Sequence, residues 1–577
     1  MEEHVHTPKS PARRRFIGQA SVTGAITIAA GLVGVEPLIN SKRSRAQAAP
    51  IQGSNQRAND CAKLRRDAAQ AGLAATPPNL QHPANDDESL YANKAGSYSK
   101  GLPHNSDGTV VLSAYQQLVG AINSKRPADF NAITIGGDRR LTNPQAGLAF
   151  DMQGPDAHAL LQPPAPAFAS KEEAAEIAEN YWMALLRDVP YSEYSSNLAA
   201  AAAASDLTNF GADFKGPKNG GTVTSSLLFR GLTPGDVVGP YLSQYFYLPC
   251  FFGANEIDQK IVTAAPFSTT GNGSGGGGRD YGTTFADWLS IQNGVNQPGD
   301  IFDPVRRHMR MGRDIGQWVH IDVLFQGYFQ AFLVLAGLGA PLDDGNPYVG
   351  NPTQDGFGTF GGPHIATLLC EVSTRALKAV WFQKWFVHRR LRPEAFAGRI
   401  ERNRTNPGTF DVHPSINGST VLAAVQQHNE QFNGAGNGTH LLPLAFPEGC
   451  PTHPAYGAGH AIVAGACVTI LKAWFKESTP IASLTTPVQP TSDGLSLVPY
   501  TGGDAAQMTV GGELNKIASN VAIGRDTAGV HWRSDATESL KLGEHVAIGI
   551  LRDQRSCYNE TFEGFSLTKF DGTTVTV

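Results

Sequence analysis

The stretch His453-Pro454-Ala455-Tyr456-Gly457-Ala458-Gly459-His460 places two histidines around a turn of small residues. The segment after it, residues 461–468 (AIVAGACV), predicts a tightly packed helix. Glycines let a backbone approach a ligand closely, and a helix N-terminus offers unpaired N–H groups at the positive end of a dipole. The stretch therefore predicts an anion cradle with an acid/base residue at its lip. Alone, such a pattern more often marks a plain turn, so the rest of the chain must show whether an anion binds here.

Five apolar segments in the C-terminal half predict long helices. They cover residues 313–338, 363–391, 456–475, 511–523 and 533–553. Alternation with a period of two, the signal of a strand, is scarce. The 63 glycines and 37 prolines indicate many loops around these helices. The sequence therefore predicts a mainly α fold, a helical bundle with long loops.

The remainder of the chain is more irregular. Residues 109–133 and 171–188 predict helices, and Ser170 before an acidic first turn predicts the cap of the second helix. We expect three regions along the chain. They are residues 1–48 as an export signal, residues 49–300 as a helical and loop region, and residues 301–577 as a catalytic helical bundle, the last two forming one continuous globular unit.

The N-terminus has the pattern of a twin-arginine export signal. Arg13-Arg14-Arg15-Phe16-Ile17 is followed by an uncharged, mildly apolar run at residues 20–35 and a small-x-small cleavage site at Ala46-Gln47-Ala48. The run is too short to predict a stable membrane span. We therefore expect an exported protein, periplasmic or extracellular; the alternative is a disordered basic tail.

The charge balance argues against a nucleic-acid partner. The chain carries a formal net charge of −5, and without residues 1–48, which hold seven Lys or Arg and three acidic residues, the charge is −9. Binding to nucleic acid favours a basic surface instead. The six cysteines form no CxxC or Cys/His cluster, so zinc is not predicted either.

Basic residues and histidines stand at predicted helix ends in three separate segments. The first contains Lys384 and Arg392, the second is the opening stretch, and the third contains Arg525 and His531. Lysine supplies a point charge and arginine a planar fork of donors, and both suit an oxyanion. One such cation is usually a solvated surface group, whereas three in these contexts predict a site for a tetrahedral oxyanion.

Taken in order, these segments resemble the signature of the vanadium-dependent haloperoxidases and the related acid phosphatases. That signature is a Lys, then Arg-Pro, then a turn ending in Gly-His, then an Arg with a His six residues later and an Asp four beyond that. The matching positions are Lys384, Arg392-Pro393, Gly459-His460, Arg525, His531 and Asp535, within roughly residues 300–555. The resemblance implies the helical bundle of this superfamily and vanadate as the cofactor.

Two details resemble the algal and cyanobacterial bromoperoxidases in particular. Lys384 and Arg392 are eight residues apart, one more than is typical of the phosphatases and fungal chloroperoxidases. A second histidine, His453, precedes His460 by seven residues, where the fungal chloroperoxidases have an aromatic residue. Trp381 matches a tryptophan that lines the site in the family.

One residue departs from the family pattern. The turn normally reads Pro-Ser-Gly-His, and here Ala458 stands at the position of the serine. The serine hydroxyl bonds an oxygen of vanadate in the family, and a charge-assisted hydrogen bond of this kind is worth about 1.5–3 kcal/mol. We therefore expect altered vanadate affinity and turnover in an otherwise complete site.

The resemblance also implies a role for each site residue. His531 binds vanadium axially, His460 is the general base toward hydrogen peroxide, and Lys384 also polarises the peroxide. Vanadate remains pentavalent as a Lewis acid. The groups that neutralise its oxygens are Lys384, Arg392, Arg525 and the backbone N–H of Gly459.

The expected roles of the neighbouring residues are less specific. His453 is expected to tune the site by bonding His460 or the vanadate shell, against a plain surface histidine. Asp322 is expected either to pair with Arg525, as an outer partner does for a metal ligand, or to be a capping or solvated aspartate. For Asp535 we favour a structural role, which is to orient a basic group or cap the following helix.

The function implied is oxidation of a halide, bromide before others, by hydrogen peroxide to hypohalous acid or to halogenated products of a small organic acceptor. Two alternatives stay open: an exported acid phosphatase of the same superfamily, and a non-catalytic oxyanion-binding helical protein. Bromoperoxidase relatives form dimers and dodecamers, so a homo-oligomer is expected. The oxygen-rich loop at residues 342–358 is a weak candidate for structural calcium, since it lacks EF-hand spacing.

Overall fold

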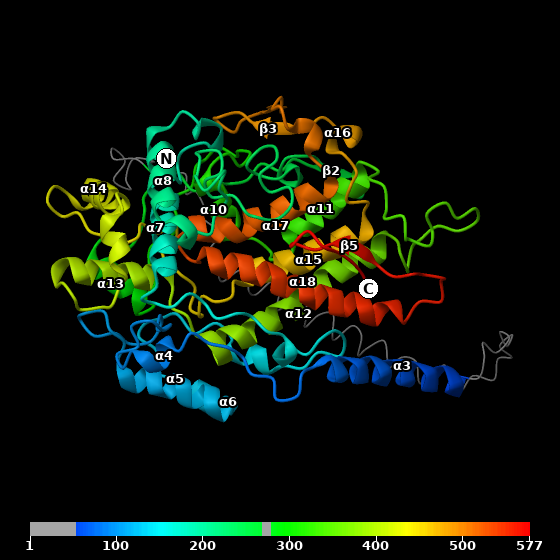
Figure 1. Ribbon diagram of the computed structural model, residues 1–577, viewed down its shortest axis with the longest axis horizontal. Coiled ribbons are helices and arrows are strands. Elements are labelled where there is room, and N and C mark those ends of the chain that lie inside the picture. Colours follow the sequence, from blue (N-terminus) through cyan, green and yellow to red (C-terminus); the bar gives the residue numbers. More distant parts are fainter. Residues whose placement is uncertain (1–53, 268–277) are drawn as a thin grey trace, which may run out of the picture. The chain divides into compact units, whose positions relative to one another are not determined.

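A computed structural model describes residues 54–267 and 278–577 (Figure 1). Its α-helices before residue 300 are α3 Ser54–Ala75, α4 Asp87–Leu90, α5 Leu112–Ser124, α6 Pro127–Asn131, α7 Lys171–Leu185, α8 Leu198–Asn209 and α9 Phe285–Gln292. Those after it are α10 Gly312–Trp318, α11 Gln326–Gly337, α12 Gly362–Phe382, α13 Pro393–Thr405, α14 Val421–Asn433, α15 Gly459–Trp474, α16 Ile481–Leu484, α17 Val510–Thr527 and α18 Arg533–Arg555. The predicted mainly α fold is confirmed.

Strands are short and confined to three antiparallel hairpins. They pair β1 Cys250–Phe252 with β2 Asn255–Ile257, β3 Val488–Pro490 with β4 Leu497–Pro499, and β5 Ser566–Thr568 with β6 Thr574–Thr576. Short 3₁₀ turns are η1 Pro144–Leu148, η2 Ala157–Ala159, η3 Tyr191–Glu193, η4 Gly211–Asp213, η5 Gln244–Phe246, η7 Pro414–Gly418 and η8 Ala505–Gln507. A π-helical turn, η6 Gln383–His388, continues α12.

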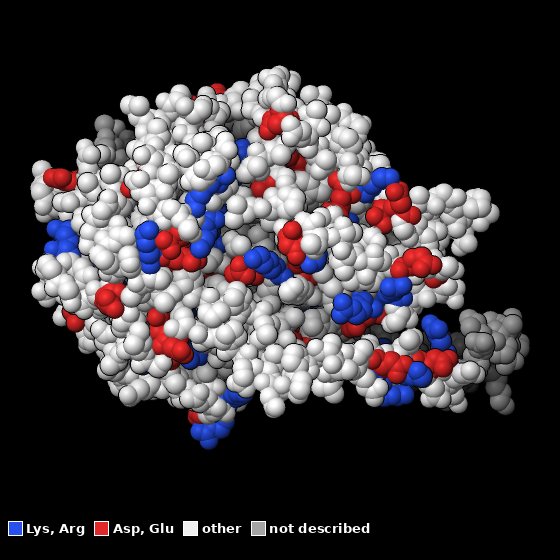
Figure 2. Space-filling view, in the orientation of Figure 1, with Lys and Arg blue, Asp and Glu red and all other residues white. Residues whose placement is uncertain are grey.

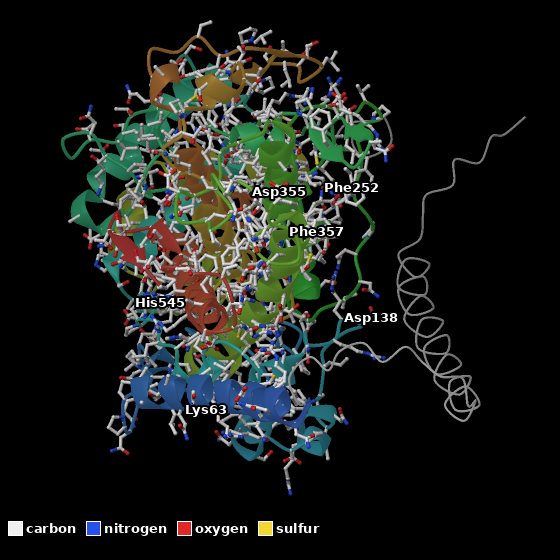
Figure 3. The ribbon with its side chains drawn as sticks, turned by 90° about the vertical axis from the view of Figure 1, so that its right-hand side faces the viewer. Lys63, Asp138, Phe252, Asp355, Phe357 and His545 are labelled. Atoms are coloured by element: carbon white, nitrogen blue, oxygen red, sulfur yellow. The ribbon has the colours of Figure 1, made fainter. Side chains whose placement is uncertain are left out.

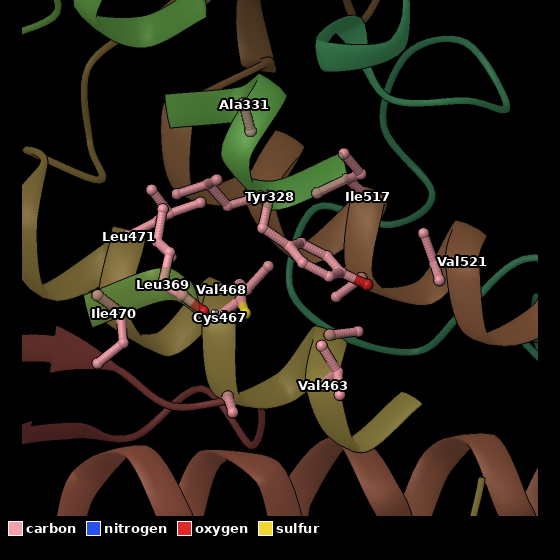
Figure 4. Packing of buried hydrophobic residues seen from close by; sticks show 14 of the residues in the cluster. Tyr328, Ala331, Leu369, Val463, Cys467, Val468, Ile470, Leu471, Ile517 and Val521 are labelled. Carbon is pink, nitrogen blue, oxygen red and sulfur yellow. Dashed lines mark hydrogen bonds between the residues drawn. The ribbon is translucent and has the colours of Figure 1, made fainter. Parts of the chain in front are cut away.

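Helix α15 is the centre of the bundle. Its residues are buried almost without exception, and it packs against α12, α17 and α18 (Figure 1). A helix that is apolar on every side needs such an environment. In Figure 4, side chains of α15 from Val463 to Leu471 interdigitate with Tyr328 of α11, Leu369 of α12 and Ile517 of α17. The first turn of this helix is thereby fixed in place.

Two glycines let α15 and α18 approach closely. A Cβ added to Gly465 would lie 2.1 Å from the carbonyl oxygen of Leu540, and one added to Gly543 would lie 2.1 Å from that of Ile462. Any larger residue at either position would push the two backbones apart. The contact places the start of α18, with His531 just before it, beside the start of α15.

The prediction of one continuous helix over residues 313–338 is wrong, because the helix is interrupted in its middle. The structure has two helices, α10 and α11, separated by a loop at residues 319–325. The carbonyl of Val319 accepts a hydrogen bond from Arg525 (2.7 Å) and so is not used within a helix. Val319, Ile321 and Val323 are β-branched, which also disfavours a helix. The break brings Asp322 to the site.

The helix predicted at residues 363–391 ends earlier than expected as a regular α-helix. Regular α12 stops at Phe382, the π-helical turn η6 follows, and Arg389 adopts a left-handed conformation with φ of 38°. The predicted cap of α7 is confirmed, because Ser170 accepts a hydrogen bond from the backbone N–H of Glu173 (3.0 Å).

The chain divides into two units, residues 1–65 and residues 66–577, and every element of the site belongs to the second. The predicted boundary at residue 300 stays a prediction. The export signal expected at residues 1–48 lies outside the described residues. Among the helices of the described part, none has the length and apolar character needed to cross a membrane. Acidic and basic side chains are interspersed on the face that Figure 2 shows.

Candidate active site

Lys384 lies in the π-helical turn η6 and is fully buried. Its ammonium donates hydrogen bonds to the carbonyl oxygens of Pro454 (2.9 Å) and Ala455 (3.1 Å). It also lies over the ring of Trp381, 5.6 Å from the centroid. The amine at the end of α12 is thus tied to the turn that precedes α15, as the sequence predicted for two parts of one site.

Arg392 precedes α13 and joins two of the predicted segments. Its Nη1 donates to His531 Nε2 (2.9 Å) and to the carbonyl of Val530 (2.6 Å). Its Nη2 lies 2.9 Å from His453 Nδ1, and Nε and Nη2 both donate to the His453 carbonyl. Only 1% of this residue is exposed. The guanidinium is therefore held rigidly between the turn and the start of α18.

Arg525 lies in the last turn of α17. Its Nη1 donates to the carbonyl of Val319 (2.7 Å), and its guanidinium lies over the ring of Phe446 at 5.4 Å. Its Nε is buried without a hydrogen-bond partner. A buried donor without an acceptor is costly, so this N–H is available to an anionic ligand.

The three cations share a feature that decides the chemistry of the site. Their hydrogen bonds go to carbonyl oxygens and to the rings of two histidines, and in the described part of the chain no carboxylate forms an ion pair with any of them. Burial, together with the charge of Arg392, lowers the pKa of Lys384 well below its usual value. Burial likewise lowers the pKa of Arg525 to about 10. Uncompensated buried positive charge favours binding of an anion.

Gly459 opens α15, where the first N–H groups have no acceptor within the helix. Ala458 is the N-cap residue and offers no capping side chain. Its own backbone N–H donates to the hydroxyl of Ser539 on α18 (2.8 Å). A Cβ on Gly459 would lie 3.2 Å from Trp381, so a larger residue would crowd the site. The helix start thus adds backbone donors to the three cations.

His531 is oriented by Asp535. The Asp535 Oδ2 atom lies 2.8 Å from His531 Nδ1 and accepts the backbone N–H of Trp532 at 3.1 Å. With Nδ1 carrying the proton, Nε2 is unprotonated, and its lone pair accepts the hydrogen bond from Arg392 (2.9 Å). Burial and the charges of Arg392 and Lys384 lower the pKa of His531 well below its usual value, so the ring stays neutral. Asp535 therefore both caps α18, as favoured from sequence, and fixes the histidine.

His460, the second residue of α15, bonds Asp322. The His460 Nε2 and Asp322 Oδ1 atoms are 2.9 Å apart. From sequence, one expected role of Asp322 was to pair with Arg525, but the structure shows the contact with His460 instead. The Asp322 charge still affects Arg525, because it raises the pKa of the arginine and so opposes the lowering caused by burial. Burial lowers the pKa of His460, and Asp322 opposes this effect.

His453 and Trp381 complete the set of predicted residues. The His453 ring lies 4.9 Å from the Trp381 ring and 6.5 Å from the His531 ring. Its Nδ1 contacts Arg392, and the structure shows no hydrogen bond from it to His460 among the described residues. Trp381 itself donates from Nε1 to the carbonyl of Thr142 (3.1 Å). His453 thus acts on the site through Arg392.

Sequence reasoning missed three residues that support the site. Arg390 bonds Asp535, Ser539 bonds the backbone of Ala458, and Phe446 lies against Arg525. Arg390 stands only two residues before Arg392, which is a usable signal. Ser539 and Phe446 belong to no local pattern, and only the folded chain brings them to the site.

The oxygen-rich loop at residues 342–358 uses its side chains internally. Asp343 accepts from the backbone of Gly345 (2.9 Å) and Asn351 from that of Thr353 (3.0 Å). Asp355 and Phe357 lie on the surface of the loop (Figure 3). Across residues 54–267 and 278–577, no three His, Cys, Asp or Glu side chains are arranged to hold a metal ion. The expectation of calcium thus gains no support here.

The chain is similar in sequence to known proteins over most of its length. A family model described as the VCPO second helical-bundle domain matches residues 374–560. A vanadium-dependent bromoperoxidase from Corallina pilulifera is 36% identical over 88% of this chain and 97% of its own length. The one from Corallina officinalis is 37% identical over 92% of this chain and all of its own length.

A solved structure has a similar fold. It is the homohexameric structure of the second vanadate-dependent bromoperoxidase of Ascophyllum nodosum, with a TM-score of 0.84 and 30% identity. The match covers 94% of this chain and 95% of the solved chain. The similarity therefore extends over both halves of the chain and is not restricted to the site.

Proposed function

The chain belongs to the family of vanadium-dependent bromoperoxidases, and from this premise we propose how its own residues carry out the reaction. The reaction is oxidation of a halide, bromide first, by hydrogen peroxide with vanadate as cofactor. Its product is hypohalous acid or a halogenated small organic acceptor. The preference for bromide rests on the names of the relatives, and the organic acceptor rests on the resemblance of the sequence to the family.

The observation that carries the proposal is the uncompensated charge of Lys384, Arg392 and Arg525. All three are buried, and none has a carboxylate partner among the described residues. Arginine and lysine donors around a helix N-terminus suit a tetrahedral or trigonal oxyanion. The orphaned Nε of Arg525 supplies a donor that such an anion would satisfy. The residues present therefore fit vanadate.

His531 would hold the vanadium through Nε2, because Asp535 occupies Nδ1, and Nε2 would then give up the hydrogen bond that it accepts from Arg392. Lys384, Arg392, Arg525 and the N–H of Gly459 would neutralise the oxygens, in the manner of an oxyanion hole. When bound, vanadate supplies a Lewis-acidic centre that activates hydrogen peroxide toward a halide. The burial of these donors excludes water, which strengthens each of their electrostatic interactions.

His460 is the proton-transfer residue of the proposal. Asp322 holds its Nε2–H, so Nδ1 is the nitrogen that would take a proton from hydrogen peroxide and pass it to the departing hydroxide, which leaves as water. Because burial lowers the pKa of His460, the ring is available as a neutral base at neutral pH. His453, through its contact with Arg392, positions the guanidinium rather than moving protons.

One paired assay tests the function. The purified apoprotein receives vanadate, and peroxide-dependent bromination is measured beside hydrolysis of a phosphate ester. Bromination that requires vanadate is expected, with repetition in chloride and iodide to give the halide range. Hydrolysis without vanadate and without bromination would establish the phosphatase alternative instead. Absence of both activities would favour the oxyanion-binding protein.

We also propose that the protein is exported and forms a homo-oligomer. Export rests on the twin-arginine pattern of residues 13–17. Fractionation of cells that express the parent chain or the double variant Arg13→Lys, Arg14→Lys tests it. The second rests on the homohexameric relative and on the dimers and dodecamers expected for the family. Light scattering of the purified protein distinguishes a dimer, a hexamer and a dodecamer by mass.

A further inference from the structure

We propose that Arg390 is a positioning residue that joins the three sequence segments of the site and fixes the orientation of His531. This role rests on the proposed function, because it concerns the histidine that would hold vanadium. Arg390 belongs to none of the motif positions matched above. Its side chain and its backbone each contact a different part of the site.

The guanidinium of Arg390 is clamped on several sides. Its Nη1 donates to Asp535 Oδ1 (2.8 Å) and to the Ser534 hydroxyl (2.8 Å). Its Nη2 donates to Glu176 Oε2 (2.8 Å) and to Glu173, both on α7. The group also lies 4.7 Å from the Trp532 ring. With 2% of the residue exposed, the fork has one available position.

Asp535 divides its two oxygens between this arginine and the site histidine. Oδ1 accepts from Arg390, whereas Oδ2 faces His531 Nδ1 at 2.8 Å. A carboxylate held at one oxygen by a charged donor presents the other oxygen in a fixed direction. The Arg390–Asp535 pair therefore fixes the tautomer with the proton on Nδ1 and leaves Nε2 as the ligand atom.

The backbone of Arg390 contacts the second segment. Its carbonyl accepts the N–H of Ala455 at 3.0 Å, and the carbonyl of Ala455 in turn accepts from Lys384 at 3.1 Å. One residue thus ties the end of α12 to the turn before α15 and to the start of α18. A shift of Arg390 would disturb His531 and the Lys384 contact together.

The neighbouring arginine offers a matched control. Arg389 adopts the left-handed conformation, φ 38°, so the two adjacent side chains leave the backbone in different directions. Arg389 donates to Glu88 (2.8 Å) and to the carbonyl of Trp385 (3.0 Å) and has no contact with Asp535 or His531 among the described residues. The substitution Arg389→Lys makes the same chemical change as Arg390→Lys in the same segment without touching the proposed connection.

The test uses Arg390→Lys, Arg390→Gln and the control Arg389→Lys in the full-length chain. Three quantities are measured: thermal stability, vanadate affinity by equilibrium dialysis, and the histidine tautomer in the apoprotein by ¹⁵N NMR. For at least one Arg390 variant that stays folded, we expect affinity to fall about 10- to 100-fold and the His531 signal to lose its single Nδ1–H form. Arg389→Lys should match the parent chain in both quantities.

A double-mutant cycle tests whether Arg390 acts through Asp535. If it does, combining Arg390→Lys with Asp535→Asn should weaken vanadate binding no more than Asp535→Asn alone. The proposal would be overturned by additive losses of affinity or by an unchanged tautomer in folded Arg390 variants. Unfolding of both Arg390 variants would also overturn it, because Arg390 would then be needed for folding and not for positioning His531. Because the tautomer is read in the apoprotein, this outcome is independent of bromination: an inactive parent chain with an Arg390-dependent tautomer would refute the proposed function alone.

Discussion

Replacing Asp322 by asparagine removes the charge that holds His460 while keeping the shape of the side chain. The two groups are 2.9 Å apart, and their side chains are 4% and 16% exposed, respectively. A hydrogen bond to a charged group at such a site is worth about 1.5–3 kcal/mol. Because about 1.4 kcal/mol corresponds to tenfold in rate, kcat/KM for hydrogen peroxide should fall about 10- to 100-fold.

Vanadate affinity should respond differently from the rate. Asp322 contributes negative charge near Arg525, so its removal leaves the cradle more positive and vanadate binding unchanged or tighter. The assay is steady-state bromination at saturating vanadate, with affinity measured separately. Asp344→Asn is the control, since that carboxylate is 75% exposed and pairs with Lys476, which follows the C-terminal end of α15, whereas His460 lies in the first turn of that helix. An unchanged kcat/KM in Asp322→Asn would refute the role given to His460.

Three further predictions concern the cradle and the buried histidines. Lys384→Met should weaken vanadate binding about 10- to 100-fold. It should not lower the melting temperature of the apoprotein, because it removes a buried cation that has no acidic partner among the described residues; calorimetry with and without vanadate checks both. Ala458→Ser should tighten vanadate binding about tenfold if the hydroxyl reaches an oxygen, and equilibrium dialysis would show no gain if it only caps α15. Burial lowers the pKa of His388 from 6.5 to about 3, so protonation favours the unfolded chain and stability falls as the pH drops from 6.5 toward 3. In His388→Gln, stability should fall less steeply with pH, by about 1.4 kcal/mol per pH unit. Denaturant titrations at pH 6, 5 and 4 check this, and an equal slope in the variant and the parent chain would contradict it.

The helices were predictable where local patterns determine them. The cap at Ser170 and the small, apolar run after Gly459 are signals that neighbouring residues supply. The β-branched residues between α10 and α11 give only a weak local signal of the break, because it also depends on Arg525, about 200 residues later, donating to the carbonyl of Val319. The π-helical turn before Arg389 leaves no such local trace either.

The site was predictable to the extent that its residues belong to spaced motifs. Lys384, Arg392, His460 and His531 were all identified from sequence, and the structure gathers them at the ends of different helices. Their partners were harder to assign. Asp322 has a carboxylate that suits either His460 or Arg525, and the choice depends on the loop conformation, which sequence spacing does not encode.

Direct measurement of vanadate binding tests the central claim that His531 and three buried cations, none of which pairs with a carboxylate in the described part of the chain, form an oxyanion site. Equilibrium dialysis of the parent chain and of His531→Ala gives stoichiometry and affinity without depending on catalysis. The expected result is one vanadate per parent chain, with binding at least tenfold weaker in folded His531→Ala. A parent chain that binds no vanadate, or a His531→Ala variant that binds it equally well, would contradict the claim.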